Sequence, residues 1–238
     1  MIMKKGVILS SPSSVRIFII GLIITTIQLL ISFTFILSFS CGVESRRWLS
    51  SSWWFSIVVI ALLILVYLIW SILNFYLNLL VVDSILAVIA NILTSLVFGI
   101  GSVYFQTLWC IILFCTAILM EFLTVIFSVQ FMPLASIACT IILIIVWVVT
   151  VLAITFSILA IVFRHSTVLH QIFAVFTTLE SLLVIPLLVS FLVSSKKQAS
   201  RSKHWLFLLS VFHILLLLLY YSLLIMFSST TRRVSMTQ

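Results

Sequence analysis

The sequence predicts an all-α membrane protein, a bundle of about seven transmembrane helices joined by short loops. The first observation is composition, because 65% of the 238 residues are hydrophobic and only 7% are charged, whereas a soluble domain carries about 25% charged residues. The second is a series of long apolar runs, each near the ~20 residues that a helix needs to cross a bilayer. Backbone groups in lipid need internal hydrogen-bond partners and no period-2 alternation is present, so each run is predicted to be a helix.

Seven runs cover most of the chain, at 17–40, 54–77, 79–101, 107–130, 135–163, 171–194 and 205–227. They divide the protein into a short basic N-terminal segment (1–16), a single polytopic membrane domain (17–227) and a short basic C-terminal tail (228–238). The first run is too long for the core of a cleaved signal peptide, so we expect it to remain as a helix. Connections are short, and no extramembrane domain is expected.

The net charge of +8 comes from 12 Lys and Arg against 4 Asp and Glu. The basic residues stand in short clusters between apolar runs, which is typical of flanks beside anionic lipid headgroups. A lipid bilayer is therefore a predicted partner and nucleic acid is not. With seven spans, seven Lys and Arg lie on the N-terminal side and five on the other, which favours a cytosolic N-terminus. If the last run instead enters the membrane and returns to the same side, the C-terminal tail joins the N-terminal side and the difference in basic residues becomes larger. This re-entrant alternative stays open.

Three of the four acidic residues lie inside apolar runs, namely Asp83, Glu121 and Glu180, and the last run contains His213. Each acid costs about 2.5–3.5 kcal/mol at mid-span on insertion scales, and such residues almost always face the bundle interior. All four are candidates for lining an ion pathway or for sensing protons. No metal site is assigned.

Helical spacing places small and polar residues beside each acid, which favours inward faces where helices approach closely. These stripes are Asp83, Ala87, Ala90, Asn91 and Thr94; Ala117, Glu121, Thr124 and Ser128; and Thr177, Glu180 and Ser181. At about 1.5 Å per residue, Asp83, Glu121 and His213 fall in one half of the bilayer and Glu180 nearer its midplane. One cavity could gather them to bind a cation. The open alternative is that protonated acids hydrogen-bond to neighbouring helices, since no Lys or Arg lies mid-span.

Other features of the chain predict structure rather than chemistry. Pro186 lies inside the sixth run, where it should kink the helix and free a backbone carbonyl. Cys110, Cys115 and Cys139 lie inside apolar runs, where a thiol behaves as a small hydrophobe. The seven Trp residues are explained by interfacial belts and lipid-facing packing. Motifs of zinc, aspartate and serine intramembrane proteases and of phosphate loops are absent from the sequence, so neither an enzyme nor a cofactor is predicted.

Several different local sequence patterns occur in a fixed order along the chain. They are Arg16 followed by Gln28-Leu29-Leu30, then Asn78, then Tyr104 and Gln106, then Thr124, Phe127 and Gln130. Together with seven short-looped spans they resemble the transmembrane Bax-inhibitor-motif family, also called the lifeguard family. The likeness extends over nearly the whole chain. The hydrophobic excess and eroded motifs look most similar to the divergent seven-transmembrane family of cytomegaloviruses.

The departures from the family are large. Basic residues after the second span are missing, and the family's acidic pair aligns with Leu187 and Ile214, neither of which can titrate. Glu180 lies two turns from the first of these positions, and His213 is adjacent to the second. No calcium-site residue is therefore carried over from the resemblance.

The resemblance implies a protein that modulates host intracellular calcium and cell-death or immune signalling, in the endoplasmic reticulum or another endomembrane rather than the plasma membrane. One hypothesis is an ion leak or channel for calcium or other cations, with Asp83, Glu121 and Glu180 lining the path. A second is a non-conducting intramembrane scaffold that binds and diverts host membrane proteins. A third is a small seven-span receptor, which the short loops disfavour.

Overall fold

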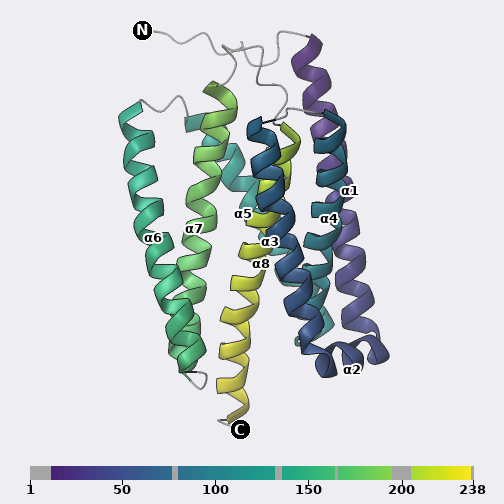
Figure 1. Ribbon diagram of the computed structural model, residues 1–238. Helices are drawn as coiled ribbons and strands as arrows, with labels where there is room; N and C mark the ends of the chain where they lie inside the picture. Colours follow the sequence, from purple (N-terminus) through teal and green to yellow (C-terminus); the bar gives the residue numbers. More distant parts are fainter. Residues whose placement is uncertain (1–11, 77–79, 132–135, 164–165, 195–204, 237–238) are drawn as a thin grey trace.

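The computed structural model describes residues 12–76, 80–131, 136–163, 166–194 and 205–236, and within these ranges every regular element is a helix. The helices are α1 (Pro12–Cys41), α2 (Val43–Ser51), α3 (Trp53–Tyr76), α4 (Leu80–Ser102), α5 (Thr107–Phe131), α6 (Ser136–Val162), α7 (Thr167–Ser194) and α8 (Trp205–Met236). They stand side by side as one bundle, with short α2 across one end (Figure 1). The predicted all-α fold is confirmed.

Seven of these helices are long and apolar enough to cross a membrane, and they coincide with the seven predicted runs. The protein is therefore a multi-pass membrane protein. Its outward surface fits this assignment, because large apolar side chains on α3 and α6 are exposed along the length of each helix. In lipid these side chains need no protein cover.

The helix α2 is the element that hydrophobic periodicity does not reveal, since its nine residues are mostly polar. Contacts with the bundle hold it in place. Leu49 is only 1% exposed, the rings of Trp48 and Phe55 meet edge to face with centroids 5.1 Å apart, and the Arg46 guanidinium donates to the backbone carbonyl of Phe105. An exposed Trp48 beside basic residues suits the membrane interface.

The helix α8 corrects the re-entrant alternative that the sequence left open. It runs without interruption from Trp205 to Met236, so the last apolar run does not re-enter and return, and α1 begins at the opposite end of the bundle from the end of α8 (Figure 1). It also continues through 228–236, which sequence reasoning assigned to a tail. This stretch contains no Gly or Pro to end the helix.

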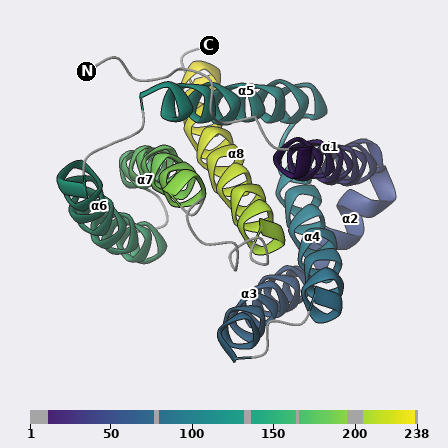
Figure 2. The same ribbon diagram turned by 90° about the horizontal axis from the view of Figure 1, so that it is seen from above.

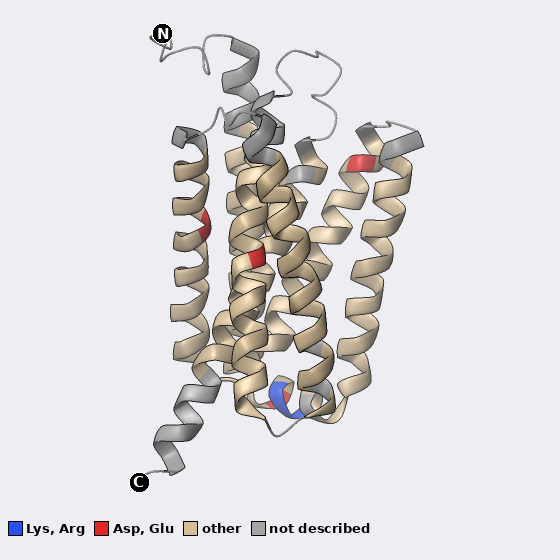
Figure 3. Ribbon diagram, turned by 90° about the vertical axis from the view of Figure 1, so that its left-hand side faces the viewer, with Lys and Arg blue, Asp and Glu red and all other residues tan. Residues whose placement is uncertain are grey.

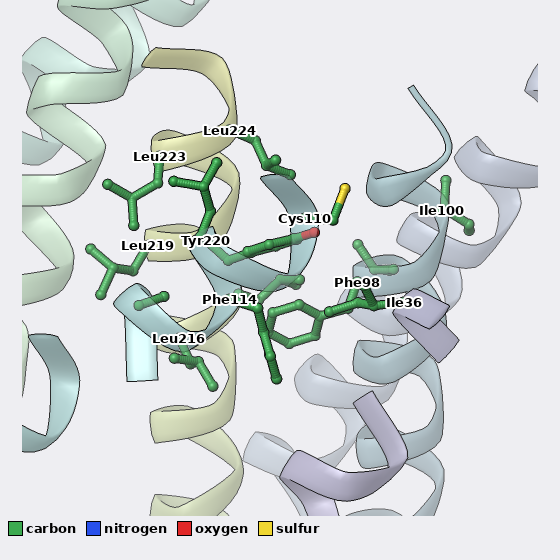
Figure 4. Packing of buried hydrophobic residues seen from close by; sticks show 14 of the residues in the cluster. Ile36, Phe98, Ile100, Cys110, Phe114, Leu216, Leu219, Tyr220, Leu223 and Leu224 are labelled. Carbon is green, nitrogen blue, oxygen red and sulfur yellow. The ribbon is translucent and has the colours of Figure 1, made fainter. Parts of the chain in front are cut away.

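The middle of the bundle is occupied by α8, which packs against α4, α5 and α7, while α6 lies at the edge against α7 (Figure 2). Aromatic rings from α4, α5 and α8 pack together in the core (Figure 4). Phe98 lies 5.4 Å from Phe114 and 5.3 Å from Tyr220, measured between ring centroids. Edge-to-face and tilted pairs of this kind add to the stability gained by burial.

Two glycines let α4 approach α1 and α8 closely. A Cβ atom at Gly99 would overlap the ring of Phe39 on α1, and one at Gly101 would overlap the ring of Tyr221 on α8. The Tyr221 hydroxyl also donates to the carbonyl of Val97 at 2.5 Å. Small residues at such crossings allow tight packing between membrane helices.

We expect Gly99→Ala and Gly101→Ala each to lower the free energy of unfolding by about 1–3 kcal/mol, because the added methyl overpacks the helix crossing. The measurement is thermal or denaturant unfolding of the purified protein in detergent micelles. Gly21→Ala is the matched control, since its Cβ would meet only Leu209, at 3.9 Å. Equal stability of Gly101→Ala and Gly21→Ala would contradict the close approach.

Candidate functional site

The candidate residues lie on four different helices: Asp83 on α4, Glu121 on α5, Glu180 on α7 and His213 on α8. Acidic positions within the described spans are few and lie apart from one another, whereas the described basic positions gather at one end of the bundle (Figure 3). The polar stripes around the acids do face inward as predicted. Ala90, Thr94, Ala117 and Ser181 are fully buried.

Asp83 is bound by a tryptophan from the neighbouring helix. The Trp70 indole Nε1 donates to Asp83 Oδ1 at 3.0 Å, and the two side chains are 0% and 4% exposed. Asp83 also lies in the first turn of α4, where the helix dipole favours a negative charge. This contact joins α3 to α4 and gives Trp70 a structural role that the interfacial explanation of tryptophan missed.

Glu180 is half-buried and joins α7 to α6. Its Oε1 accepts a hydrogen bond from the Thr150 hydroxyl at 2.9 Å. Two residues earlier, on another face of α7, the Thr178 hydroxyl lies 2.7 Å from the Ser222 hydroxyl and joins α7 to α8. Hydrogen bonds of hydroxyl and carboxyl groups thus connect α7 to both α6 and α8.

His213 is 4% exposed and belongs to a buried network of three side chains. Its Nε2 lies 2.9 Å from the Ser32 hydroxyl, and that same hydroxyl lies 2.9 Å from the Ser95 hydroxyl. The ring also stands edge to face on Phe98, with centroids 5.6 Å apart. One polar network therefore connects α1, α4 and α8 at the centre of the bundle.

Glu121 differs from the other three candidates. Its side chain is half-buried, on the same helical face as the buried residues Ala117 and Ser128. Within the part of the chain that the structure describes, no hydrogen bond reaches its carboxyl group. A carboxyl group in the membrane interior without such a partner is the arrangement that most needs a functional explanation.

The four candidates do not form one common site. Across the described residues there is no group of three or more His, Cys, Asp or Glu side chains able to hold a metal ion. Asp83, Glu180 and His213 instead have separate partners on separate helices. Pro186 lies within α7, which continues past it to Ser194.

The partners of these residues were not singled out from the sequence. Trp70, Thr150, Ser32 and Ser95 are uncharged, so no search for ionisable groups finds them. One signal was present, because Gln28, Ser32, Ile36 and Ser40 recur every four residues on α1 and all are buried. A polar stripe inside an apolar run indicates a face that packs against other helices.

No protein-family model, curated protein or solved structure matches this chain. The Bax-inhibitor-motif resemblance therefore stays a prediction from local sequence patterns.

We expect Trp70→Phe to lower the free energy of unfolding by about 1–3 kcal/mol, because a smaller aromatic ring remains but the buried Asp83 carboxyl loses its donor. Unfolding in detergent measures the change. Trp147→Phe is the control, since Trp147 is 65% exposed on α6. If both variants lower the free energy of unfolding by the same amount, the hydrogen bond from Trp70 to Asp83 does not contribute to stability.

For the central network, Ser32→Ala should destabilise the protein more than Thr26→Ala, because Ser32 bonds to two other helices whereas exposed Thr26 bonds only to the carbonyl of Leu22 on its own helix. A double-mutant cycle with His213→Leu should give a coupling free energy of about 0.6–1.7 kcal/mol, the range for hydrogen bonds between membrane helices. Strictly additive effects would show that the Ser32–His213 contact is not energetically significant.

Proposed function

We propose that the protein is a non-enzymatic, multi-pass membrane protein that provides a cation leak across its membrane, with Glu121 on the ion pathway. The observation that carries this proposal is the inward-facing Glu121 carboxyl group, to which no described residue hydrogen-bonds. Intramembrane acids that face the bundle interior commonly mark ion or proton pathways.

The contacts of the other candidates narrow the pathway that the sequence suggested. Asp83 and Glu180 each accept a hydrogen bond from an adjacent helix, and His213 belongs to the Ser32 network. A group that holds two helices together is poorly placed to exchange that contact for a passing ion. We therefore assign these three residues to helix packing and Glu121 alone to ion handling.

The family resemblance suggests the membrane in which the leak would act and the cellular processes that it would affect. A cation leak in the endoplasmic reticulum or another endomembrane would alter intracellular calcium, either directly or through the membrane potential. Cell-death and immune signalling would then change as consequences of the altered ion balance. These are the processes that the resemblance to the Bax-inhibitor-motif proteins implies.

The second candidate function is a non-conducting scaffold that binds other membrane proteins. Two observations favour it. Most of the intramembrane acids serve as ties between helices, and α6 packs chiefly against α7 while exposing apolar side chains such as Trp147 and Ile154. A partner helix could lie along α6 without disturbing the rest of the bundle.

Ion flux into proteoliposomes that contain only this protein separates the two functions. We expect flux of Na⁺, K⁺ or Ca²⁺ above that of empty liposomes, reduced at least fivefold by Glu121→Gln because the permeating cation loses its counter-charge. Glu180→Gln makes the same chemical change on α7 and should retain most of the flux, since a glutamine oxygen still accepts from Thr150.

Folding of each variant is checked by size-exclusion chromatography and circular dichroism before reconstitution. Absence of flux from well-folded wild-type protein would exclude the leak and leave the scaffold. Equal flux from wild type and Glu121→Gln would remove Glu121 from the pathway.

A further inference from the structure

We propose that the end of the bundle crossed by α2 binds the headgroup of one anionic phospholipid, whose phosphate lies on Arg46. This surface does not involve Glu121, so the inference stands whether or not the protein conducts ions. Its elements are a partly buried guanidinium with few acceptors, a group of exposed aromatic side chains at the same end, and an exposed apolar face of α5.

The protein satisfies the positive charge of Arg46 only in part. The side chain is half-buried, one terminal nitrogen donates to the carbonyl of Phe105, and Nε is buried without an acceptor. Among the residues that the structure describes, no carboxylate pairs with this guanidinium. A partly buried charge without a counter-charge costs free energy, and an anion beside it would offset that cost.

Phosphate is an anion that suits this group. Arginine is favoured at phosphate sites because its planar guanidinium offers five N–H donors. The bond to Phe105 engages one of them and leaves further donors on the terminal nitrogens. That bond also holds the side chain against the connection between α4 and α5, so less conformational entropy is lost when a ligand binds.

Exposed aromatic side chains place Arg46 at the depth of lipid headgroups. Trp48 on α2 is 50% exposed, and Tyr104 in the connection between α4 and α5 is 61% exposed. Trp53 and Trp54, in the first turn of α3, are 66% and 55% exposed. The helix α2, the start of α3 and the α4–α5 connection share one end of the bundle (Figure 1). Trp and Tyr are enriched where hydrocarbon meets headgroups, which is also where lipid phosphates lie.

An exposed apolar face of α5 leads from this site into the membrane. Leu108, Ile112 and Leu119 are 66%, 43% and 56% exposed. Their spacings of four and seven residues place them on one face of the helix. That face begins three residues after Phe105, whose carbonyl binds Arg46. An acyl chain along it would accompany a phosphate at Arg46, so the surface suits a phospholipid rather than a free phosphate ion.

The charge of α2 favours a lipid with a net negative charge. Its nine residues include Arg46, Arg47 and Glu44, so the helix carries one more positive than negative charge. Basic residues beside the membrane attract anionic lipids. A phosphatidylcholine headgroup brings its own cation to the arginines, whereas phosphatidylglycerol brings only the phosphate.

The test is the lipid-dependent thermal stability of the purified full-length protein in detergent micelles. Phosphatidylglycerol, phosphatidylcholine with the same acyl chains, glycerol 3-phosphate and inorganic phosphate are added one at a time. We expect phosphatidylglycerol to raise the Tm by about 2–4 °C, because a ligand that binds only the folded state stabilises it. Phosphatidylcholine should give less than half of that rise, and the two anions without acyl chains should give none.

The variants assign the rise to one side chain. Arg46→Gln should abolish it, and native mass spectrometry should show that this variant loses a phosphatidylglycerol molecule that the wild type retains. Arg47→Gln makes the same change on the neighbouring exposed side chain and should keep most of the rise. If Arg46→Gln does not fold, Arg46→Lys still decides the question. It keeps the charge but lacks the planar donors, so half-saturation should need at least fivefold more phosphatidylglycerol.

Three results would overturn the site. A rise that persists in Arg46→Gln, wild-type half-saturation in Arg46→Lys, or an equal loss of the rise in Arg47→Gln would show that Arg46 does not form it. An equal rise with inorganic phosphate would indicate a free-anion site in place of a lipid site. An equal rise with phosphatidylcholine would show that acyl chains stabilise the protein without a contribution from the headgroup.

Discussion

The structure depends on one constraint, that polar groups placed in hydrocarbon must find their partners within the protein. The Ser32 hydroxyl shows how the bundle meets it, because it contacts both Ser95 and the His213 ring at 2.9 Å. That network joins α1, α4 and the central α8 in a region otherwise packed by apolar and aromatic side chains. A buried polar group without a partner costs free energy, so the network favours one arrangement of these three helices over others.

The same constraint divides the four ionisable candidates into two classes. Asp83, Glu180 and His213 accept or share hydrogen bonds with side chains of adjacent helices, and these bonds account for the presence of these residues in the membrane. Glu121 has no such bond to any residue that the structure describes, and its half-buried side chain lies on the same face of α5 as buried Ala117. The position of an intramembrane ionisable residue is thus explained by packing in three cases, and Glu121 is the exception.

The sequence predicted the number, order and approximate bounds of the spans because apolar length is sufficient to identify them. For the three helices that carry an acid, α4, α5 and α7, it also predicted the inward face, from the small and polar residues beside each acid. It could not reveal α2, whose nine residues are held by Leu49 and Arg46 contacts with the bundle, nor the pairing of Trp70 with Asp83. Such contacts depend on which helices become neighbours, and helix order in the chain does not determine that.

The most direct test of this division of roles is an infrared difference spectrum of the carboxyl groups, recorded on the purified protein as Na⁺ replaces N-methylglucamine. The account predicts a change in one carboxyl group that disappears in Glu121→Gln and persists in Asp83→Asn and Glu180→Gln. A carboxyl signal that survives Glu121→Gln, or one that is lost in Asp83→Asn or Glu180→Gln, would contradict it.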